Sequence, residues 1–367
     1  MRRIVPLLLV LVLLLSGCRR REEIPPSPAE EPPQETEEPS GARPITGESP
    51  LELDSLRMEI SRAGLDSDRL MEAARKLPEL LRSALADCGV AVNTVQVTIG
   101  SSPAATVQAL NAGTVDIAVL PAEGLAGQET EAAVLLASGP GGKDAPLWTD
   151  CAVGDQTTLW MAPTDYGLNL VGRVGKEGDL PSWAELNQAR WGLLGTESLP
   201  GRRAVDLWLA DHYGGNTTAN LSRVTVYGDF DQLLQAAADG EIDVFPAGGG
   251  VMEPGTEDGE GASAFFRLGD CEQFYETVLA VSPQRTDLSL PELNFRDPLM
   301  FALTALCFYD GTQTLPDGTP AFSGDGYDRE TRMLCRDVFG EHRYAWAENQ
   351  DLLPVRRLLA LEGRAGE

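Results

Sequence analysis

Small hydroxyl residues precede two expected helices and could form an oxyanion site. Ser101-Ser102-Pro103 opens one helix, and Thr196, Ser198 and Gly201 precede another. Backbone N–H groups at a helix start carry partial positive charge and attract phosphate-like groups without a Lys or Arg side chain. Ser is also a common helix cap, and Pro is favoured at the first helical position. Both helix starts are therefore expected to be capped, and both are candidates for oxyanion binding.

Charged residues near these segments are further candidates for ligand contact. Arg202 and Arg203 could bind an anion or lie on the helix surface. Glu123 follows an apolar strand, at the place where open α/β sheets bind ligands. Asp229 could pair with a ligand amine or cap the next helix, and Asp243 could contact a ligand or bind backbone groups where a strand starts.

The chain lacks recognisable motifs of common catalytic and metal sites. No Gly-x-Ser-x-Gly segment is present, and neither His212 nor His342 lies in a catalytic motif. No CxxC pair occurs, which argues against zinc. We therefore expect no enzyme activity, metal or cofactor, with carboxylate-based hydrolysis by a lipid-anchored enzyme as the remaining alternative. The cysteines after Cys18 could form one or two disulfides or be buried as small apolar residues.

From residue 51 onward, apolar runs with the period of a strand alternate with runs of helical period. The expected strands cover residues 56–60, 92–99, 115–120, 157–161, 167–171, 190–194, 224–227 and 277–282. The expected helices cover residues 66–87, 103–113, 182–186, 202–212, 229–240, 297–308 and 329–339. Strands that alternate with helices predict an α/β fold with mainly parallel sheets.

One strand–helix–strand unit occurs twice. Residues 111–117 and 238–244 both end a helix on Gly, continue as apolar-Asp-apolar into a strand and soon reach Pro-Ala. The two aspartates of these units are Asp116 and Asp243. The repeat predicts two similar α/β lobes.

The N-terminal residues have the pattern of a bacterial lipoprotein signal. Residues 1–17 contain two early arginines and an apolar run that is short for a membrane-spanning helix. The run ends in Leu15-Ser16-Gly17-Cys18, which matches a lipobox. We expect a diacylglyceryl group on Cys18 to hold the protein to the outer face of the cytoplasmic membrane. Residues 18–50 are rich in Pro and Glu and predict a disordered linker.

The remaining chain is long enough for two lobes. We expect residues 51–160 to begin the first lobe, 161–250 to form the second, 251–264 to be an acidic Gly-rich loop, and 265–367 to return to the first lobe. Lys and Arg number 29 against 56 Asp and Glu, a net charge of −27. Such an acidic surface argues against nucleic acid as a partner, and the body is expected to be a monomer. It does not fix the charge of a ligand, because a buried site sets its own field.

Four segments, taken in order, carry a family resemblance. They read ALNAGTVDIAVLPA, DLPSWAELNQARWGLLGTES, YGDFDQLLQAAADGEIDVFPA and NQDLLPVRRLL. In this order they resemble the phosphonate-binding PhnD-like family of ABC-transporter solute-binding proteins, which has the type II periplasmic-binding fold. The resemblance spans roughly residues 52 to 358.

This resemblance implies two lobes joined by a hinge and a ligand buried in the cleft between them, which closes on binding. It implies delivery to an ABC permease driven by an ATPase. It also implies an anion seat in the Ser/Thr loop, where the family's Ser-Thr-Ser-Gly is Thr-Glu-Ser-Leu-Pro-Gly at residues 196–201. Glu197 adds a negative charge there, Pro121-Ala122-Glu123-Gly124 replaces a common aromatic, and Leu353 replaces a Tyr. The ligand could be a phosphonate, a phosphate ester, or another small solute with an amine or sulfonate. A ligand-sensing or partner-binding lipoprotein without transport is the alternative function.

Overall fold

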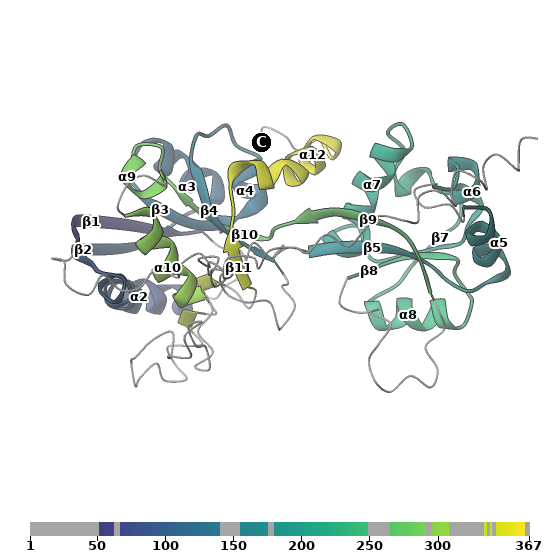
Figure 1. Ribbon diagram of the computed structural model, residues 1–367, viewed down its shortest axis with the longest axis horizontal. Coiled ribbons are helices and arrows are strands. Elements are labelled where there is room, and N and C mark those ends of the chain that lie inside the picture. Colours follow the sequence, from purple (N-terminus) through teal and green to yellow (C-terminus); the bar gives the residue numbers. More distant parts are fainter. Residues whose placement is uncertain are drawn as a thin grey trace, which may run out of the picture. The chain divides into compact units, whose positions relative to one another are not determined.

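Two β-sheets, each flanked by helices, form the body of the protein (Figure 1). The computed structural model describes residues 51–61, 67–139, 155–174, 180–248, 265–290, 295–307, 334–335, 338–339 and 343–363. The predicted signal peptide, Cys18, the linker at 18–50 and the loop at 251–264 lie outside the described residues, as does most of the predicted helix at 329–339.

The first sheet has the strand order β11-β4-β10-β3-β1-β2. Its strands are β1 (Leu51–Ile60), β2 (Val90–Ile99), β3 (Ile117–Pro121), β4 (Ala133–Gly139), β10 (Thr277–Val281) and β11 (Arg343–Trp346). β1 is parallel to β2 and β3, whereas β10 is antiparallel to both β3 and β4, and β11 is antiparallel to β4. The sheet is therefore mixed rather than mainly parallel.

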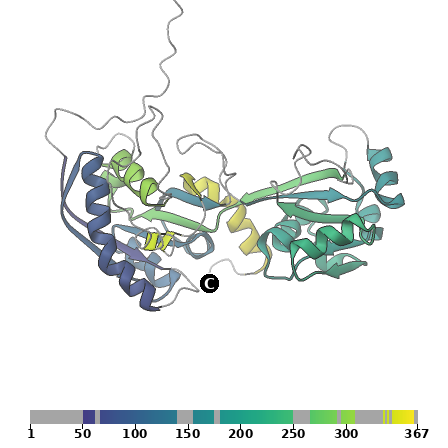
Figure 2. The same cartoon turned by 90° about the horizontal axis from the view of Figure 1, so that it is seen from below.

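Helices cover both faces of this first sheet. They are α2 (Ser67–Asp87), α3 (Pro103–Asn111), α4 (Ala122–Ala126), α9 (Thr286–Ser289), α10 (Arg296–Cys307) and α12 (Leu353–Leu361), the last preceded by a 3-10 turn, η3 (Asn349–Leu352). α2 and α10 pack apolar side chains on one face, and Figure 2 shows the long α2 across it. α3, α4 and α12 belong to the cluster on the other face.

The second sheet has the order β7-β6-β8-β5-β9. Its strands are β5 (Asp155–Met161), β6 (Trp191–Leu193), β7 (Val224–Val226), β8 (Val244–Gly248) and β9 (Phe266–Phe274). Its helices are α5 (Asp165–Val174), α6 (Trp183–Gln188), α7 (Ala204–His212), α8 (Phe230–Ala238), the π-helical turn η1 (Leu199–Arg203) and the 3-10 turn η2 (Thr218–Asn220). α8 packs on one face of the sheet, and α5, α6 and α7 pack on the other.

The two sheets share one strand plan. The order β2-β1-β3-β10-β4 in the first matches β7-β6-β8-β5-β9 in the second, and the fourth strand is antiparallel to both its neighbours in each. This confirms the expectation of two similar α/β lobes. Both β5 and β9 pair within the second sheet, so sheet membership differs from the lobe boundaries predicted at residues 161 and 265. The chain returns to the first sheet between β9 and β10.

One predicted strand was wrong. Residues 167–171 belong to helix α5. The alternation of Leu168 and Leu170 fits a short strand, but Thr164 Oγ1 accepts a hydrogen bond from Gly167 N at 3.0 Å and fixes a helical first turn. Local capping outweighed the alternating pattern here, because a run of five residues carries little periodic information.

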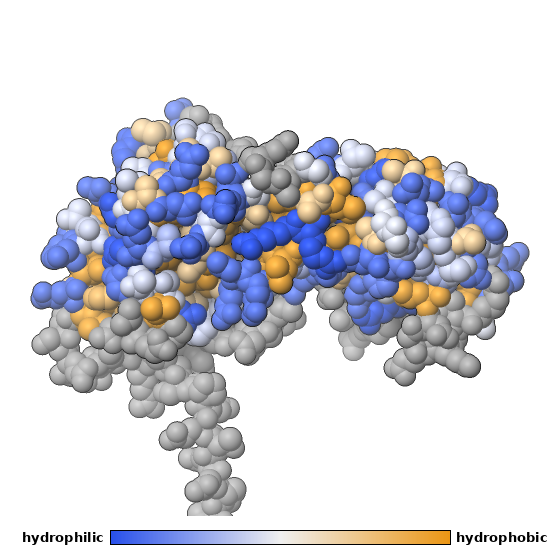
Figure 3. Space-filling model, turned by 90° about the horizontal axis from the view of Figure 1, so that it is seen from above, coloured by the Kyte–Doolittle hydropathy of each residue, from blue (hydrophilic) through white to orange (hydrophobic). Residues whose placement is uncertain are grey.

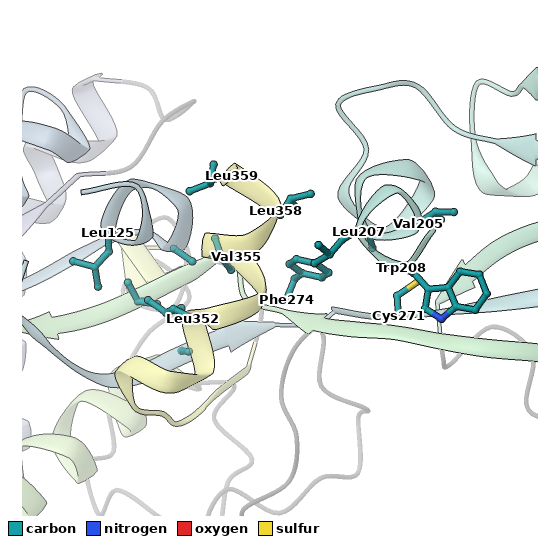
Figure 4. Packing of buried hydrophobic residues seen from close by; sticks show 14 of the residues in the cluster. Leu125, Val205, Leu207, Trp208, Cys271, Phe274, Leu352, Val355, Leu358 and Leu359 are labelled. Carbon is teal, nitrogen blue, oxygen red and sulfur yellow. The ribbon is translucent and has the colours of Figure 1, made fainter. Parts of the chain in front are cut away.

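Helix α12 lies within an apolar cluster that includes residues of both lobes. Leu352, Val355, Leu358 and Leu359 share this cluster with Leu125 of α4, Leu207 and Trp208 of α7, and Phe274 of β9 (Figure 4). α12 contacts α4, α7 and β9. The C-terminal helix is therefore a packing element for both sheets and not a peripheral addition.

Candidate functional site

The loop before helix α7 is fixed by its own hydrogen bonds. Ser198 Oγ accepts from Gly201 N at 3.1 Å, and Leu194 N donates to Gly201 O at 3.1 Å. The buried Thr157 Oγ1 donates to Pro200 O at 3.1 Å. This loop therefore has a defined shape before any ligand binds.

Glycine at position 201 is required by close packing. A Cβ at this position would lie 2.6 Å from Leu194 Cβ and Cγ, nearer than real side-chain atoms approach. The helical turn that contains Gly201 begins at Leu199, whereas the sequence predicted a helix start at residue 202. Ser198 caps this turn. The loop is thus one turn shorter than the sequence alone indicated.

A pocket of about 370 Å³ opens at this loop and is lined by Thr196, Glu197, Arg203 and Glu362. Thr196 and Glu197 are exposed. Within the described part of the chain, the backbone N–H groups of these two residues donate to no protein acceptor. An oxyanion accepts hydrogen bonds from free N–H groups and from a guanidinium, so the donors at this pocket suit an oxyanion.

Arg203 is the cation at this pocket, and two carboxylates bind it. Nε and NH2 donate to the two oxygens of Glu362 at 2.6 and 2.9 Å, and NH1 donates to Glu123 Oε1 at 2.6 Å. The Arg203 side chain is only 11% exposed. Burial alone would lower its pKa, but the bonds to Glu362 and Glu123 outweigh burial and raise the pKa. Arg203 therefore stays charged at every physiological pH.

The sequence could not single out Arg203 or its partner Glu362. Two arginines stand side by side, and adjacent residues on a helix point about 100° apart, so only the structure decides which one faces the pocket. Arg202 is half-buried, does not line the pocket, and uses its backbone N–H on Ser198 O. Glu362 lies 159 residues away from Arg203 in sequence, and no local pattern links the two.

The start of helix α3 in the first lobe is capped as predicted. Ser102 Oγ accepts from Ala105 N at 3.2 Å, Pro103 follows it, and Ser101 is exposed. A carboxylate that the sequence analysis missed lies nearby, because Glu59 Oε1 accepts from Thr106 Oγ1 at 2.5 Å. The negative charge of Glu59 therefore lies beside the first turns of α3, where it interacts favourably with the positive end of the helix dipole.

Glu123 is brought close to the start of α3. It lies in the first turn of α4, and a Cβ on the neighbouring Gly124 would meet Pro103 Cβ at 2.5 Å. Glu123, which binds Arg203, is therefore next in sequence to the glycine that packs on the α3 start. Ser101 and Ser102 are not among the residues that line the pocket at Thr196.

The two aspartate candidates have defined protein partners. Asp229 caps α8, where its Oδ1 accepts from Gln232 N at 2.8 Å and its Oδ2 from Gln232 Nε2 at 2.9 Å. Asp243 is buried and accepts from Arg190 N, Nε and NH2 and from Thr164 Oγ1, at 2.6 to 3.0 Å. These contacts are the capping and strand-start roles that the sequence left open beside ligand binding.

Asp116 repeats the arrangement of Asp243 in the other lobe. It accepts from Arg57 N, Nε and NH2 at 2.7 to 3.1 Å, and Arg285 lies at 3.0 Å. Burial would raise the pKa of either aspartate, but hydrogen bonds from the arginine outweigh it and lower the pKa. Both aspartates are therefore ionised structural anchors at the start of a strand.

The described residues hold no group of three or more His, Cys, Asp or Glu that could bind a metal. Among these residues there is also no helix of the length and apolar character needed to cross a membrane. Cys88, Cys271 and Cys335 are free thiols. Burial raises the pKa of Cys88 to about 11 and of Cys335 to about 12, so neither is a reactive thiolate.

A family model for periplasmic phosphonate substrate-binding proteins of ABC transporters matches residues 64–294. The chain belongs to this family. Its members are substrate-binding components of ABC transporters, so this substrate-binding protein acts on the extracytoplasmic side of a membrane and captures a small solute for import. The two mixed sheets, each flanked by helices, form the two α/β lobes of this substrate-binding protein.

Solved structures similar to this substrate-binding protein include PhnD1 of Prochlorococcus marinus in complex with methylphosphonate (11% identity, 85% of this chain and 99% of that chain, TM-score 0.38). XAC2383 of Xanthomonas citri bound to ATP has 14% identity, 85% and 97% coverage and a TM-score of 0.36. A phosphonate transporter binding protein of Pseudomonas aeruginosa has 13% identity, 86% and 88% coverage and a TM-score of 0.33. Curated protein sequences show no match. At these low scores, residue roles come from this chain's own geometry.

Proposed function

We propose that this substrate-binding protein captures a small oxyanion solute of the phosphonate or phosphate-ester class at the loop of Thr196, Ser198 and Gly201. The observation that carries the proposal is the pocket that joins the exposed Thr196 to the guanidinium of Arg203. The free N–H groups of Thr196 and Glu197 point to an acceptor that is an oxygen-rich anion. The solute then passes to the permease and ATPase of an importer.

The α3 start completes the proposed site from the first lobe. Ser101 is exposed and stands one residue before the cap of α3, so its hydroxyl and N–H can reach a solute. Arg202 and the capping carboxylate Asp229 remain candidates for outer contacts. We leave Asp243 with its structural role, because Arg190 and Thr164 already occupy both carboxylate oxygens.

The test is the affinity of full-length protein, kept in mild detergent, for methylphosphonate and inorganic phosphate. We expect the double substitution Thr196→Ala with Ser198→Ala to weaken binding about tenfold or more, about 1.4 kcal/mol. The matched control is Thr217→Ala with Ser222→Ala, a half-buried Thr cap and an exposed Ser elsewhere in the same lobe. If calorimetry gives equal affinities for both double variants, the loop is not the anion seat.

We also propose that a lipid on Cys18 anchors the protein to the outer face of the membrane. Residues 15–18 form the lipobox, and a single apolar run precedes it. Replacing Cys18 with Ser should move the protein from the membrane fraction to the soluble extracytoplasmic fraction, because acyl burial is lost. A variant that still sediments with membranes and keeps its wild-type migration would exclude lipidation at this residue.

A further inference from the structure

A salt-bridge triad lies beside the proposed anion seat. Arg203 of the π-helical turn binds Glu123 of α4 and Glu362 at the end of α12. Glu197 also lines the pocket, so a third acidic residue lies at it. Figure 3 shows this face, the side on which α12 lies, with strongly hydrophilic side chains next to apolar ones.

The two carboxylates hold Arg203 unequally. Glu362 binds through both oxygens, a fork geometry that suits a guanidinium. The bond from Arg203 to Glu123 uses one oxygen, and the Glu123 side chain is more exposed than that of Glu362, at 31% against 24%. Since a two-point bond is stronger than a one-point bond, Glu123 is the partner that leaves Arg203 more readily.

An oxyanion that reaches this pocket meets more carboxylates than guanidinium groups, so part of its attraction to Arg203 is offset by repulsion. Like charges repel, and the repulsion is stronger near a protein surface than in bulk water. A solute bound to Thr196 and Arg203 would sit beside Glu123 as well, so repulsion is lowered when that carboxylate moves away. The solute oxygens then take over the hydrogen bond that Glu123 receives from NH1.

We propose that Glu123 is an internal competitor of the solute: its carboxylate occupies Arg203 in the ligand-free protein, and a bound oxyanion displaces it. Glu362 keeps its two-point bond and continues to orient Arg203. This inference rests on the proposed function, since it assigns Arg203 to the oxyanion. It makes Glu123 a residue that sets affinity by opposing the ligand and not by contacting it.

The test compares affinities of full-length wild type, Glu123→Gln and Glu272→Gln for methylphosphonate and inorganic phosphate by calorimetry. Glu123→Gln should bind at least about threefold more tightly, because the neutral amide competes poorly for a guanidinium. Glu272 pairs with Arg357 on α12 away from the pocket residues, so Glu272→Gln changes the net charge equally and should leave affinity unchanged.

The increase in affinity that we expect for Glu123→Gln must depend on Arg203. Adding Arg203→Gln to the Glu123→Gln variant should abolish the increase, since no guanidinium is left to compete for. An unchanged or weaker affinity in Glu123→Gln overturns the inference, and so does a gain that survives without Arg203. If wild type binds the anions but Glu123→Gln gains nothing, the anion seat stands and the competitor role fails. If neither binds any oxyanion, both fail.

Discussion

At the scale of single residues, the same aspartate–arginine pairing is built twice. Asp116 with Arg57 and Asp243 with Arg190 each join a backbone N–H and a guanidinium at the start of a strand. The sequence showed the repeated aspartates, but not their partners. Arg57 lies 59 residues from Asp116, and Arg190 lies 53 residues from Asp243. Strand pairing between distant segments creates the contact, so it leaves no local signal.

Replacing Asp243 with Asn should destabilise the protein by about 2–3 kcal/mol, because a buried charge pair loses one partner while the partly exposed Arg190 regains some hydration. Chemical unfolding followed by circular dichroism measures the change. Asp239→Asn is the control, since this exposed carboxylate only contacts Gln235 at the end of α8. We expect the control to stay within about 0.5 kcal/mol of wild type.

The same aspartates give the stability a defined pH dependence. The folded pKa of Asp116 and Asp243 is lowered, so each contributes stability that is present above the unfolded pKa of about 3.9. This contribution is lost as the pH falls through the folded pKa below that value. Wild type should therefore lose stability below about pH 4, and Asp243→Asn should lose less over the same range. If wild type and Asp243→Asn lose the same amount of stability as the pH falls below about 4, Asp243 does not cause this pH dependence.

At the scale of elements, capping residues made several boundaries predictable. Ser102 was an expected cap and capping was one of two roles expected for Asp229, and each accepts a hydrogen bond from the first turn of its helix. These signals are readable because donor and acceptor lie three residues apart. The start at Leu199 was missed although Ser198 caps it and accepts a hydrogen bond from Gly201 N, because the expected helix was placed after Gly201, at residue 202.

Gly201→Ala tests whether the anion loop depends on this close packing. The added methyl group meets the Leu194 side chain, so we expect a loss of about 1–3 kcal/mol in thermal unfolding. Gly172→Ala is the matched control, since nothing lies within 4 Å of its Cβ position in α5. That control should stabilise by about 0.5–1 kcal/mol through helix propensity. A Gly201→Ala variant as stable as wild type would show that Leu194 moves freely.

At the scale of the whole described body, helix α12 provides packing that the sequence did not reveal. The tail segment was recognised by its resemblance to a family motif, yet its apolar partners come from α4, α7 and β9. Its polar side adds Arg357, which pairs with Glu272 of β9 and Asp211 of α7. The two-lobed plan was therefore predictable from repeated local patterns, whereas the elements that join the sheets were not.

Leu358→Ala should cost about 2–4 kcal/mol, because this side chain is 1% exposed in the shared cluster. The control Leu361→Ala, on the same helix but 36% exposed, should change stability by less than about 0.5 kcal/mol. Calorimetric unfolding measures both. A Leu358→Ala protein with the wild-type melting temperature would show that α12 adds little to the core.

Strand β10 lies between β3 and β4 in the first sheet, yet it follows the entire second lobe in sequence. A ribosome and an export channel release the chain from its N-terminus, so β3 and β4 emerge long before their common neighbour. Until then each has an unpaired edge and the first lobe lacks a central strand. A nascent chain of this order therefore stays open through most of its synthesis, which is the condition a polypeptide needs for threading through a membrane before it folds.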